Sequence, residues 1–241
     1  MNNTIDGAPE HELLEYSQTH DKQVLQSTTF KRIATDFSLA NKKVLDIGCS
    51  VGSHMQRFGA GSVGITTNPK EVSLGKVIHR DIRLGNVERL DEVLQSEEAF
   101  DVIWCNNIFE HLLSPHAFLV NLKRFATPDT IIILGTPMVP WPTQLMLFRR
   151  FRGALASAHV NFFTKKTYTL TVKFTGWSVE NISTYKTPSK LLNLLLTPFW
   201  PHLYLIAKND SAYRYHKKKL NEWEHDPLYQ PLIEIMNNGG K

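Results

Sequence analysis

Short apolar runs alternate with amphipathic segments along most of the chain. The runs at 43–47, 62–66, 76–80, 101–105, 130–134, 177–182 and 203–207 have the length and composition of β-strands. Helical periodicity covers 23–39, 84–95, 115–125 and 165–174, with one short helical turn at 53–58. Strands that alternate with helices predict an α/β fold, in which a mostly parallel sheet of seven strands carries helices on both faces.

The chain divides into three predicted parts. Residues 1–42 form an N-terminal helical segment that we expect to act as a lid, and residues 43–208 form the α/β domain. This domain contains an irregular insertion at 136–161, rich in Pro, Phe and Arg, of the kind that often carries substrate specificity. Residues 209–241 join a basic run to an acidic run and predict a helical tail.

Composition limits the class of protein and its setting. With 42% hydrophobic and 21% charged residues, the 241-residue chain is typical of a folded globular protein, and its net charge of +4 is modest. The cysteines, Cys49 and Cys105, lack CxxC spacing and companion histidines, so we expect reduced thiols and no metal site. The N-terminus has no secretory pattern, and the apolar stretch at 191–200 is too short to span a bilayer. We therefore expect a cytoplasmic protein, with peripheral contact at the inner membrane face left open.

The segment "KVLDIGCSVGSH", residues 43–54, predicts a buried strand that runs into a glycine turn. Its two glycines, Gly48 and Gly52, stand four positions apart, with Ser50 where a dinucleotide fingerprint has its middle glycine. Asp46 precedes the turn, and a carboxylate there repels phosphate but suits a cationic group such as the ammonium of an amino acid. The turn therefore favours a ligand with a cationic group over a pyrophosphate.

Five segments in order resemble the motifs of class I S-adenosylmethionine-dependent methyltransferases, in the small-molecule branch typified by ubiquinone biosynthesis. They are "VLDIGCSVG", "VIHRDI", "FDVIWCNNIFEH", "TPDTIIILGTP" and "HVNFFTKKTYTLTVKFTGWSVE". The resemblance covers residues 43–208. It implies a Rossmann-like fold whose last strand is antiparallel, S-adenosyl-L-methionine as cofactor and S-adenosyl-L-homocysteine as product.

The resemblance also implies a set of cofactor-binding residues. Adenine would meet Asp81 and Ile82, and the ribose would meet the end of the second strand. That strand lacks the acidic residue that usually holds the ribose and ends in Thr66 and Thr67, so the hydroxyl groups must substitute. The full predicted set is Asp46, Gly48, Cys49, Ser50, Gly52, Thr66, Thr67, Asn68, Asp81, Ile82, Asn106 and Asn107.

The acceptor end of the site depends on two histidines and an arginine cluster. His111 and His159 are candidate catalytic bases, with Glu110 as an orienting partner. The segment "QLMLFRRFRGALA", residues 144–156, carries Arg149, Arg150 and Arg152 for an anionic substrate, and alternatively serves as a lid helix or a membrane contact.

These features predict methyl transfer to a hydroxyl, and less favourably to an amine, of a small molecule that is sugar-containing, anionic or lipid-like. The segment "CNNIF" lacks the element of nucleic-acid amine methyltransferases, which argues against a nucleic-acid partner. A non-catalytic methyltransferase-like binding protein and an NAD(P)-dependent reductase are the alternatives, the second disfavoured by the missing G-x-G-x-x-G. The pattern does not indicate an oligomeric state.

Overall fold

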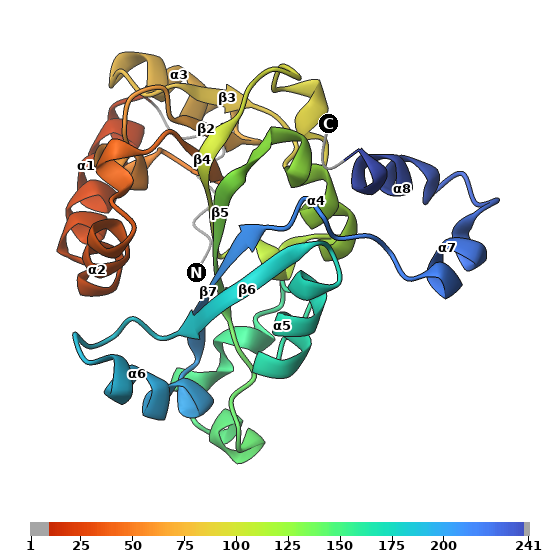
Figure 1. Ribbon diagram of the computed structural model, residues 1–241. Coiled ribbons are helices and arrows are strands. Elements are labelled where there is room, and N and C mark those ends of the chain that lie inside the picture. Colours follow the sequence, from red (N-terminus) through yellow and green to blue (C-terminus); the bar gives the residue numbers. More distant parts are fainter. Residues whose placement is uncertain (1–9, 239–241) are drawn as a thin grey trace.

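The computed structural model describes residues 10–238, and one seven-stranded sheet forms its centre (Figure 1). The strand order is β3-β2-β1-β4-β5-β7-β6. The strands are β1 Val44–Ile47, β2 Val63–Thr66, β3 Ile82–Leu84, β4 Phe100–Asn106, β5 Ala126–Pro137, β6 Trp177–Ser183 and β7 His202–Asn209. The five strands from β3 to β5 run parallel, whereas β7 is antiparallel to both β5 and β6. This is the mixed, mostly parallel sheet that the sequence predicts.

Helices cover both faces of the sheet (Figure 1). On one side lie α1 (Glu10–Gln26) and α2 (Thr28–Asp36), and on the other lie α4 (Pro115–Asn121) and α5 (Lys165–Lys173). The remaining α-helices are α3 (Pro69–Val77), α6 (Lys190–Leu196), α7 (Lys217–Trp223) and α8 (Gln230–Asn237). Thr164 begins α5 as predicted, and its hydroxyl and that of Thr167 cap each other's backbone N–H in a capping box.

Alternate residues of each strand supply two separate cores. In β1, Leu45 and Ile47 join the larger core under α4 and α5, whereas Val44 joins the core under α2. Trp104 of β4 belongs to the second core, where it contacts Phe30 edge-on with the ring centroids 5.4 Å apart. Both faces of the sheet are therefore dry, and polar side chains gather at the strand ends, as is usual for parallel sheets.

The third strand and the helix after it differ from the prediction. Asn68 caps α3 by accepting from the Lys70 N–H at 3.0 Å, and the proline after it occupies the first helical turn. This helix extends through Val77, so the predicted strand at 76–80 is wrong and β3 begins at Ile82. The strand β3 includes Leu84, so the helix predicted at 84–95 cannot begin there. Only a 3₁₀ turn at Leu90–Glu92 forms in that segment.

Two other helical predictions change as well. The helix predicted at 23–39 is divided at Ser27, whose side chain caps α2 by accepting from the Phe30 N–H at 3.2 Å. The segment 144–156 is not a continuous lid helix, because it forms two 3₁₀ turns at Thr143–Leu147 and Arg149–Leu155.

The segment after β7 packs against α4. Val120 of α4 shares a small core with Tyr215, Leu232, Ile235 and Met236. No helix among residues 10–238 combines the length and apolar character that a membrane span requires.

Candidate functional site

The glycine turn after β1 has the tight backbone that a closely approaching ligand requires. Gly48, Ser50 and Gly52 have φ values of 70°, 50° and 73°, in the left-handed region. A Cβ on Gly48 would lie 2.3 Å from the Ile108 side chain, so the loop after β4 packs directly on this turn. Ser50 occupies the middle position in a conformation that costs a non-glycine residue energy. Its hydroxyl compensates by donating to Glu71.

Asp46 lies at the carboxyl end of β1, directly below the turn. Its side chain is buried, and its Oδ2 finds no hydrogen-bond partner among the residues that the structure describes. Burial raises the pKa of this carboxyl to about 8. A buried, unpartnered carboxyl group at a ligand-binding turn is suited to a cationic ligand, which would restore its charge. The position therefore fits the ammonium of an amino-acid moiety.

Glu71 brings a carboxylate to the place where the end of β2 lacks one. It lies one turn into α3, is buried, and accepts from the Ser50 hydroxyl at 2.9 Å and from the Thr66 hydroxyl. The Thr66 hydroxyl therefore donates to Glu71, Thr67 is exposed, and the Asn68 side chain caps α3. The sequence reasoning missed Glu71 because it searched only the last residues of the strand. Its spacing of three from the cap residue Asn68, inside the first turn of a helix, is the signal that could have found it.

The adenine assignment changes with the position of β3. Asp81 precedes β3, lies at the amino end of the strand, and pairs with Arg83 at 3.0 Å. Ile82 is buried inside the sheet. Neither residue reaches the carboxyl edge, where ligands of open α/β sheets bind. The prediction that these two residues contact adenine is therefore corrected. Asn86 follows β3 at that edge, beside Gly85, whose N–H donates to the Thr66 carbonyl at 2.8 Å.

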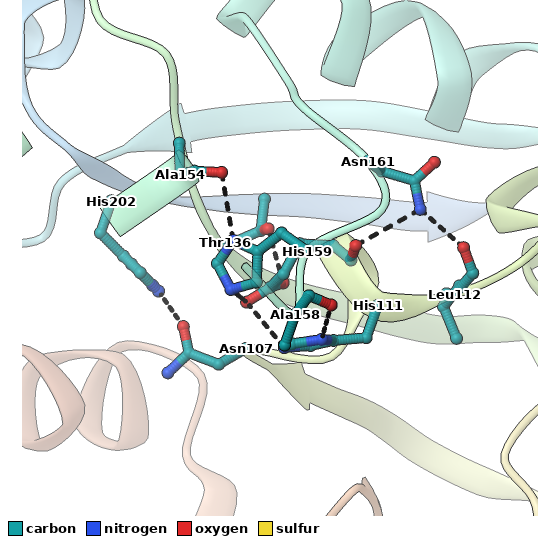
Figure 2. Close-up of polar contacts among 10 residues, drawn as sticks. Asn107, His111, Leu112, Thr136, Ala154, Ala158, His159, Asn161 and His202 are labelled. Carbon is teal, nitrogen blue, oxygen red and sulfur yellow. Dashed lines mark hydrogen bonds and ion pairs between the residues drawn. The ribbon is translucent and has the colours of Figure 1, made fainter. Parts of the chain in front are cut away.

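Two predicted asparagines lie at the end of β4. His202, the first residue of β7, lies beside them and was not selected by the sequence reasoning. Asn106 has a buried Oδ1 that no other group in residues 10–238 hydrogen-bonds. Asn107 adopts a φ of 58°, and its Oδ1 lies 2.9 Å from His202 Nε2 (Figure 2). Burial lowers the pKa of His202 to about 4, so its ring is neutral at pH 7 and donates here. The antiparallel direction of β7 places its first residue, His202, at this edge. The predicted direction of this strand could therefore have identified His202 as a site residue.

His111 and His159 meet beyond the end of β4, although 47 residues separate them. Their rings contact edge-on, with centroids 4.7 Å apart and an interplanar angle of 87° (Figure 2). Each Nε2 lies 3.9 Å from Oε1 of Glu110. Glu110 is buried and its other oxygen accepts from the Thr136 hydroxyl at 2.8 Å. The structure thus brings the two predicted catalytic histidines together around the predicted orienting carboxylate.

Asn161 fixes the segment of His159 against the segment of His111. Its Nδ2 donates to the Leu112 carbonyl at 2.6 Å, and its backbone N–H donates to the Glu110 carbonyl at 3.0 Å (Figure 2). Because Asn161 is held by the backbone carbonyls of Glu110 and Leu112, the histidine pair is set before any ligand arrives.

The three arginines lie on the outer surface of the insertion. All are exposed, and Arg152 donates to the carbonyls of Met146 and Leu147 within its own segment. Arg150 stacks over Trp200, 5.2 Å from the ring centroid. The structure therefore does not bring these side chains to the histidine pair as it does Glu110.

Asp21 makes the polar contacts that hold helix α1 over the glycine turn. The carboxylate of Asp21 pairs with Arg80 at 2.7 Å and accepts from the Ser53 hydroxyl at 2.7 Å. Arg80 in turn donates to the Val51 carbonyl at 2.7 Å. The N-terminal segment therefore forms one wall of the site.

Comparison with known proteins agrees with this arrangement. A family model described as a methyltransferase domain matches residues 18–182. The ubiquinone biosynthesis O-methyltransferase of Maricaulis maris is 33% identical over 103 residues, which are 39% of this chain and 40% of that protein. That of Haemophilus ducreyi is 33% identical over 109 residues, 41% of this chain and 46% of that protein. The chain spans less than half the length of these curated relatives.

Solved structures share the fold at low identity. A TehB-like SAM-dependent methyltransferase from Corynebacterium glutamicum has a TM-score of 0.54 and 16% identity, covering 83% of this chain and all of that chain. Magnesium protoporphyrin IX methyltransferase from Synechocystis PCC 6803, solved with bound S-adenosylhomocysteine, has a TM-score of 0.52 and 17% identity, covering 79% of this chain and 83% of that chain.

The strand order, the glycine turn and the buried Asp46 define the class I S-adenosylmethionine-dependent methyltransferases. Within that class, the chain belongs to the methyltransferase domain family. The predictions of fold, family and cofactor are confirmed. Asp46, Gly48 and Ser50 are the residues of this chain whose geometry fits the amino-acid end of the cofactor.

Proposed function

We propose that the protein transfers a methyl group from S-adenosylmethionine to a hydroxyl oxygen of a small molecule. The observation that carries the proposal is that the glycine turn follows β1 and the histidine pair follows β4, so that both lie at the carboxyl edge of the sheet. The named activity of the ubiquinone biosynthesis relatives, O-methylation, supports a hydroxyl over an amine.

On the cofactor side, each part of the ligand has a matching group. Asp46 would receive the ammonium, Glu71 the ribose hydroxyls and Asn86 the adenine, and Asn106 offers a buried Oδ1 without a partner among the described residues. When bound, the cofactor supplies an electrophilic methyl group on a sulfonium, and its sulfur keeps the electron pair of the broken bond. The protein contributes alignment of the acceptor oxygen and a path for its proton.

The acceptor hydroxyl would lie at His111 and His159. The Nδ1 of each ring lies against a backbone carbonyl, at 3.0 Å from Ala158 and 3.2 Å from Ala154. A carbonyl only accepts, so each Nδ1 carries a proton, and in the neutral form of the ring Nε2 offers a lone pair. These lone pairs can accept the hydroxyl proton as the oxygen takes the methyl group.

Among the predicted acceptor chemistries, an amphiphilic, lipid-like molecule has the most support. A groove of about 620 Å³ lies between the start of the insertion, α5 and the approach to β7. Met138, Trp141, Leu170 and Trp200 make its lining largely apolar, and Lys165 stands at its edge. Such a groove suits an apolar chain whose polar end is anionic.

We also propose peripheral contact with an anionic membrane. Residues 130–209 contain nine lysines and arginines and one acidic residue, Glu180, so this stretch carries +8 in a chain whose total is +4. Large apolar side chains are exposed on the same part of the molecule, namely Leu147, Phe148, Leu155, Leu191, Leu194 and Leu195. Arg150 and Lys186 both stack on Trp200, which joins the insertion to the segment of α6. Apolar groups among cations are the signature of a surface that lies on anionic lipid.

Calorimetry with S-adenosylhomocysteine, followed by a methyl-transfer assay on lipid-soluble phenols and alcohols, tests the proposal. Binding of the product together with formation of a methyl ether is the expected result. Binding without any turnover would support the remaining alternative, a methyltransferase-like binding protein. A folded protein that fails to bind the product would contradict the proposal.

A further inference from the structure

We infer that Glu110, His111 and His159 form a binding site for a divalent transition-metal cation. One carboxylate oxygen and one nitrogen from each ring lie within 4.8 Å of one another. In the part of the chain that the structure describes, this is the one group of three potential metal ligands that meets such a limit. The sequence interpretation assigned no metal, because His159 is 48 positions away from His111.

The three converging atoms are all hydrogen-bond acceptors. The Ala158 and Ala154 carbonyls hold the proton on each Nδ1, so both Nε2 atoms present lone pairs to the same point. Glu110 adds Oε1, which is buried and has no hydrogen-bond partner within residues 10–238. Its other oxygen is already satisfied by Thr136. Three acceptors that face one another are a repulsive arrangement unless a cation lies between them.

A shared proton does not resolve this arrangement. Each Nε2 lies 3.9 Å from Glu110 Oε1, which is too far for a hydrogen bond. A metal ion with bonds of about 2.1 Å spans such separations, because ligand atoms on opposite sides of the ion lie about twice that length apart.

The surroundings have the features of a metal site beyond its ligands. Histidine ligands usually donate their other ring N–H to a carbonyl or carboxylate, and both rings do so here. Thr136 orients the carboxylate, and Asn161 fixes the two loops together. Two imidazoles and one carboxylate favour Zn²⁺, Fe²⁺, Co²⁺ or Mn²⁺ over Mg²⁺ or Ca²⁺.

Three protein ligands leave coordination positions open toward the cleft. His111 keeps 30% of its side chain exposed, so the open side faces solvent and the acceptor. A hydroxyl oxygen of the acceptor would occupy an open position, where the cation favours its deprotonated form and the released proton passes to solvent water. This role rests on the proposed function. In this role, His111 and His159 bind the cation and do not accept the hydroxyl proton themselves.

Titration of the chelator-treated full-length protein with Co²⁺ tests the site, because cobalt bound by few ligands gives a strong visible absorption. We expect one equivalent to bind. His111→Ala, His159→Ala and Glu110→Gln should each weaken binding at least tenfold, since each removes one of three ligands. The matched control is His225→Ala, which removes an exposed histidine of the tail and should leave the titration unchanged.

Binding of S-adenosylhomocysteine in the presence of chelator separates this inference from the proposed function. Retained product binding shows that each variant is folded, and Glu110→Gln keeps a side chain that can still accept from Thr136. Cobalt binding weaker than millimolar, or binding that the three ligand variants leave unchanged, would overturn the metal site while the proposed function stood. Loss of product binding in the unmodified protein would overturn the proposed function whatever cobalt did.

Discussion

The Ser50 hydroxyl donates to the Glu71 carboxylate at 2.9 Å, and this contact joins the glycine turn to the first turn of α3. Glu71 also accepts from the Thr66 hydroxyl, so a carboxylate stands beside the end of β2 although the strand itself ends in threonines. Glu71 thus places a carboxylate at the end of β2, where we propose that it binds the ribose hydroxyls.

Glu71→Gln is expected to weaken S-adenosylhomocysteine binding about tenfold, because a neutral amide holds ribose hydroxyls less strongly than a carboxylate. Calorimetry measures this loss. An analogue without ribose hydroxyls should lose little affinity on the same substitution, and Glu92→Gln, at an exposed carboxylate, is the control. An equal loss for both ligands would show that Glu71 supports the turn and does not bind ribose.

Asp46 should make product binding depend on pH. Its pKa of about 8 leaves it protonated at neutral pH, and the ammonium of the ligand favours the ionised form. Affinity for S-adenosylhomocysteine should therefore rise by up to about tenfold per pH unit between pH 6 and 8, with proton release that calorimetry detects in buffers of different ionisation enthalpy. Asp46→Asn should abolish the release, whereas Asp129→Asn, at an exposed carboxylate, should not.

The same carboxyl should lower the stability of the ligand-free protein as pH rises. Its pKa is raised in the folded state, so between about pH 4 and pH 8 the folded state holds a proton that the unfolded state has lost. Each pH unit in this window costs up to about 1.4 kcal/mol of unfolding free energy. The difference between the unmodified protein and Asp46→Asn in thermal unfolding isolates this slope. A difference that does not change with pH would contradict it.

Loss of the Asp21 carboxylate should release α1 from the glycine turn. Asp21→Asn removes the charge that pairs with Arg80, which we expect to cost about 1–3 kcal/mol of local stability. Hydrogen exchange of α1 should rise, and product affinity should fall with it. Asp91→Asn, in a pair with Arg124 at 3.9 Å, is the surface control. Unchanged exchange in α1 would show that apolar contacts alone hold the helix.

Lys123 should contribute to stability from inside the protein. Its Nζ donates to the Gly176 carbonyl, Asn209 Oδ1 and the Asp210 carbonyl at 2.6–3.0 Å. Lys123→Met leaves these acceptors unsatisfied and should cost about 2–4 kcal/mol in denaturant unfolding. Burial lowers the pKa of Lys123 to about 8, so the unmodified protein should gain stability relative to the variant as pH rises above 8. Lys217→Met, at an exposed lysine, should do neither.

The surface around α6 should bind vesicles that contain phosphatidylglycerol but not vesicles of phosphatidylcholine alone. Replacing Arg149, Arg150, Lys186 and Lys190 by Gln should reduce co-sedimentation by several-fold per charge, at about 1 kcal/mol each. Replacing Lys217 and Lys218, which are exposed on α7, provides a control with part of the same charge change. Equal sedimentation of both sets would place the contact elsewhere.

Structural features that depend on neighbouring residues could be predicted from the sequence alone. The glycine turn and the capped start of α5 follow from short segments whose backbone preferences need no distant partner. The order of apolar runs likewise indicated the sheet. The prediction of the third strand was wrong because Asn68 and Pro69 start a helix that continues through Val77, into the predicted strand. The predicted position of Asp81 at the end of that strand was wrong for the same reason.

Only the tertiary structure decided which distant side chains share a site. Glu71 meets Ser50 because α3 folds back over the turn, and Glu110 meets His159 because Asn161 fixes one loop on another. His202 reaches Asn107 because β7 runs antiparallel. Contacts between residues far apart in the chain depend on strand order and direction, which the packing of the whole sheet sets and no local segment encodes.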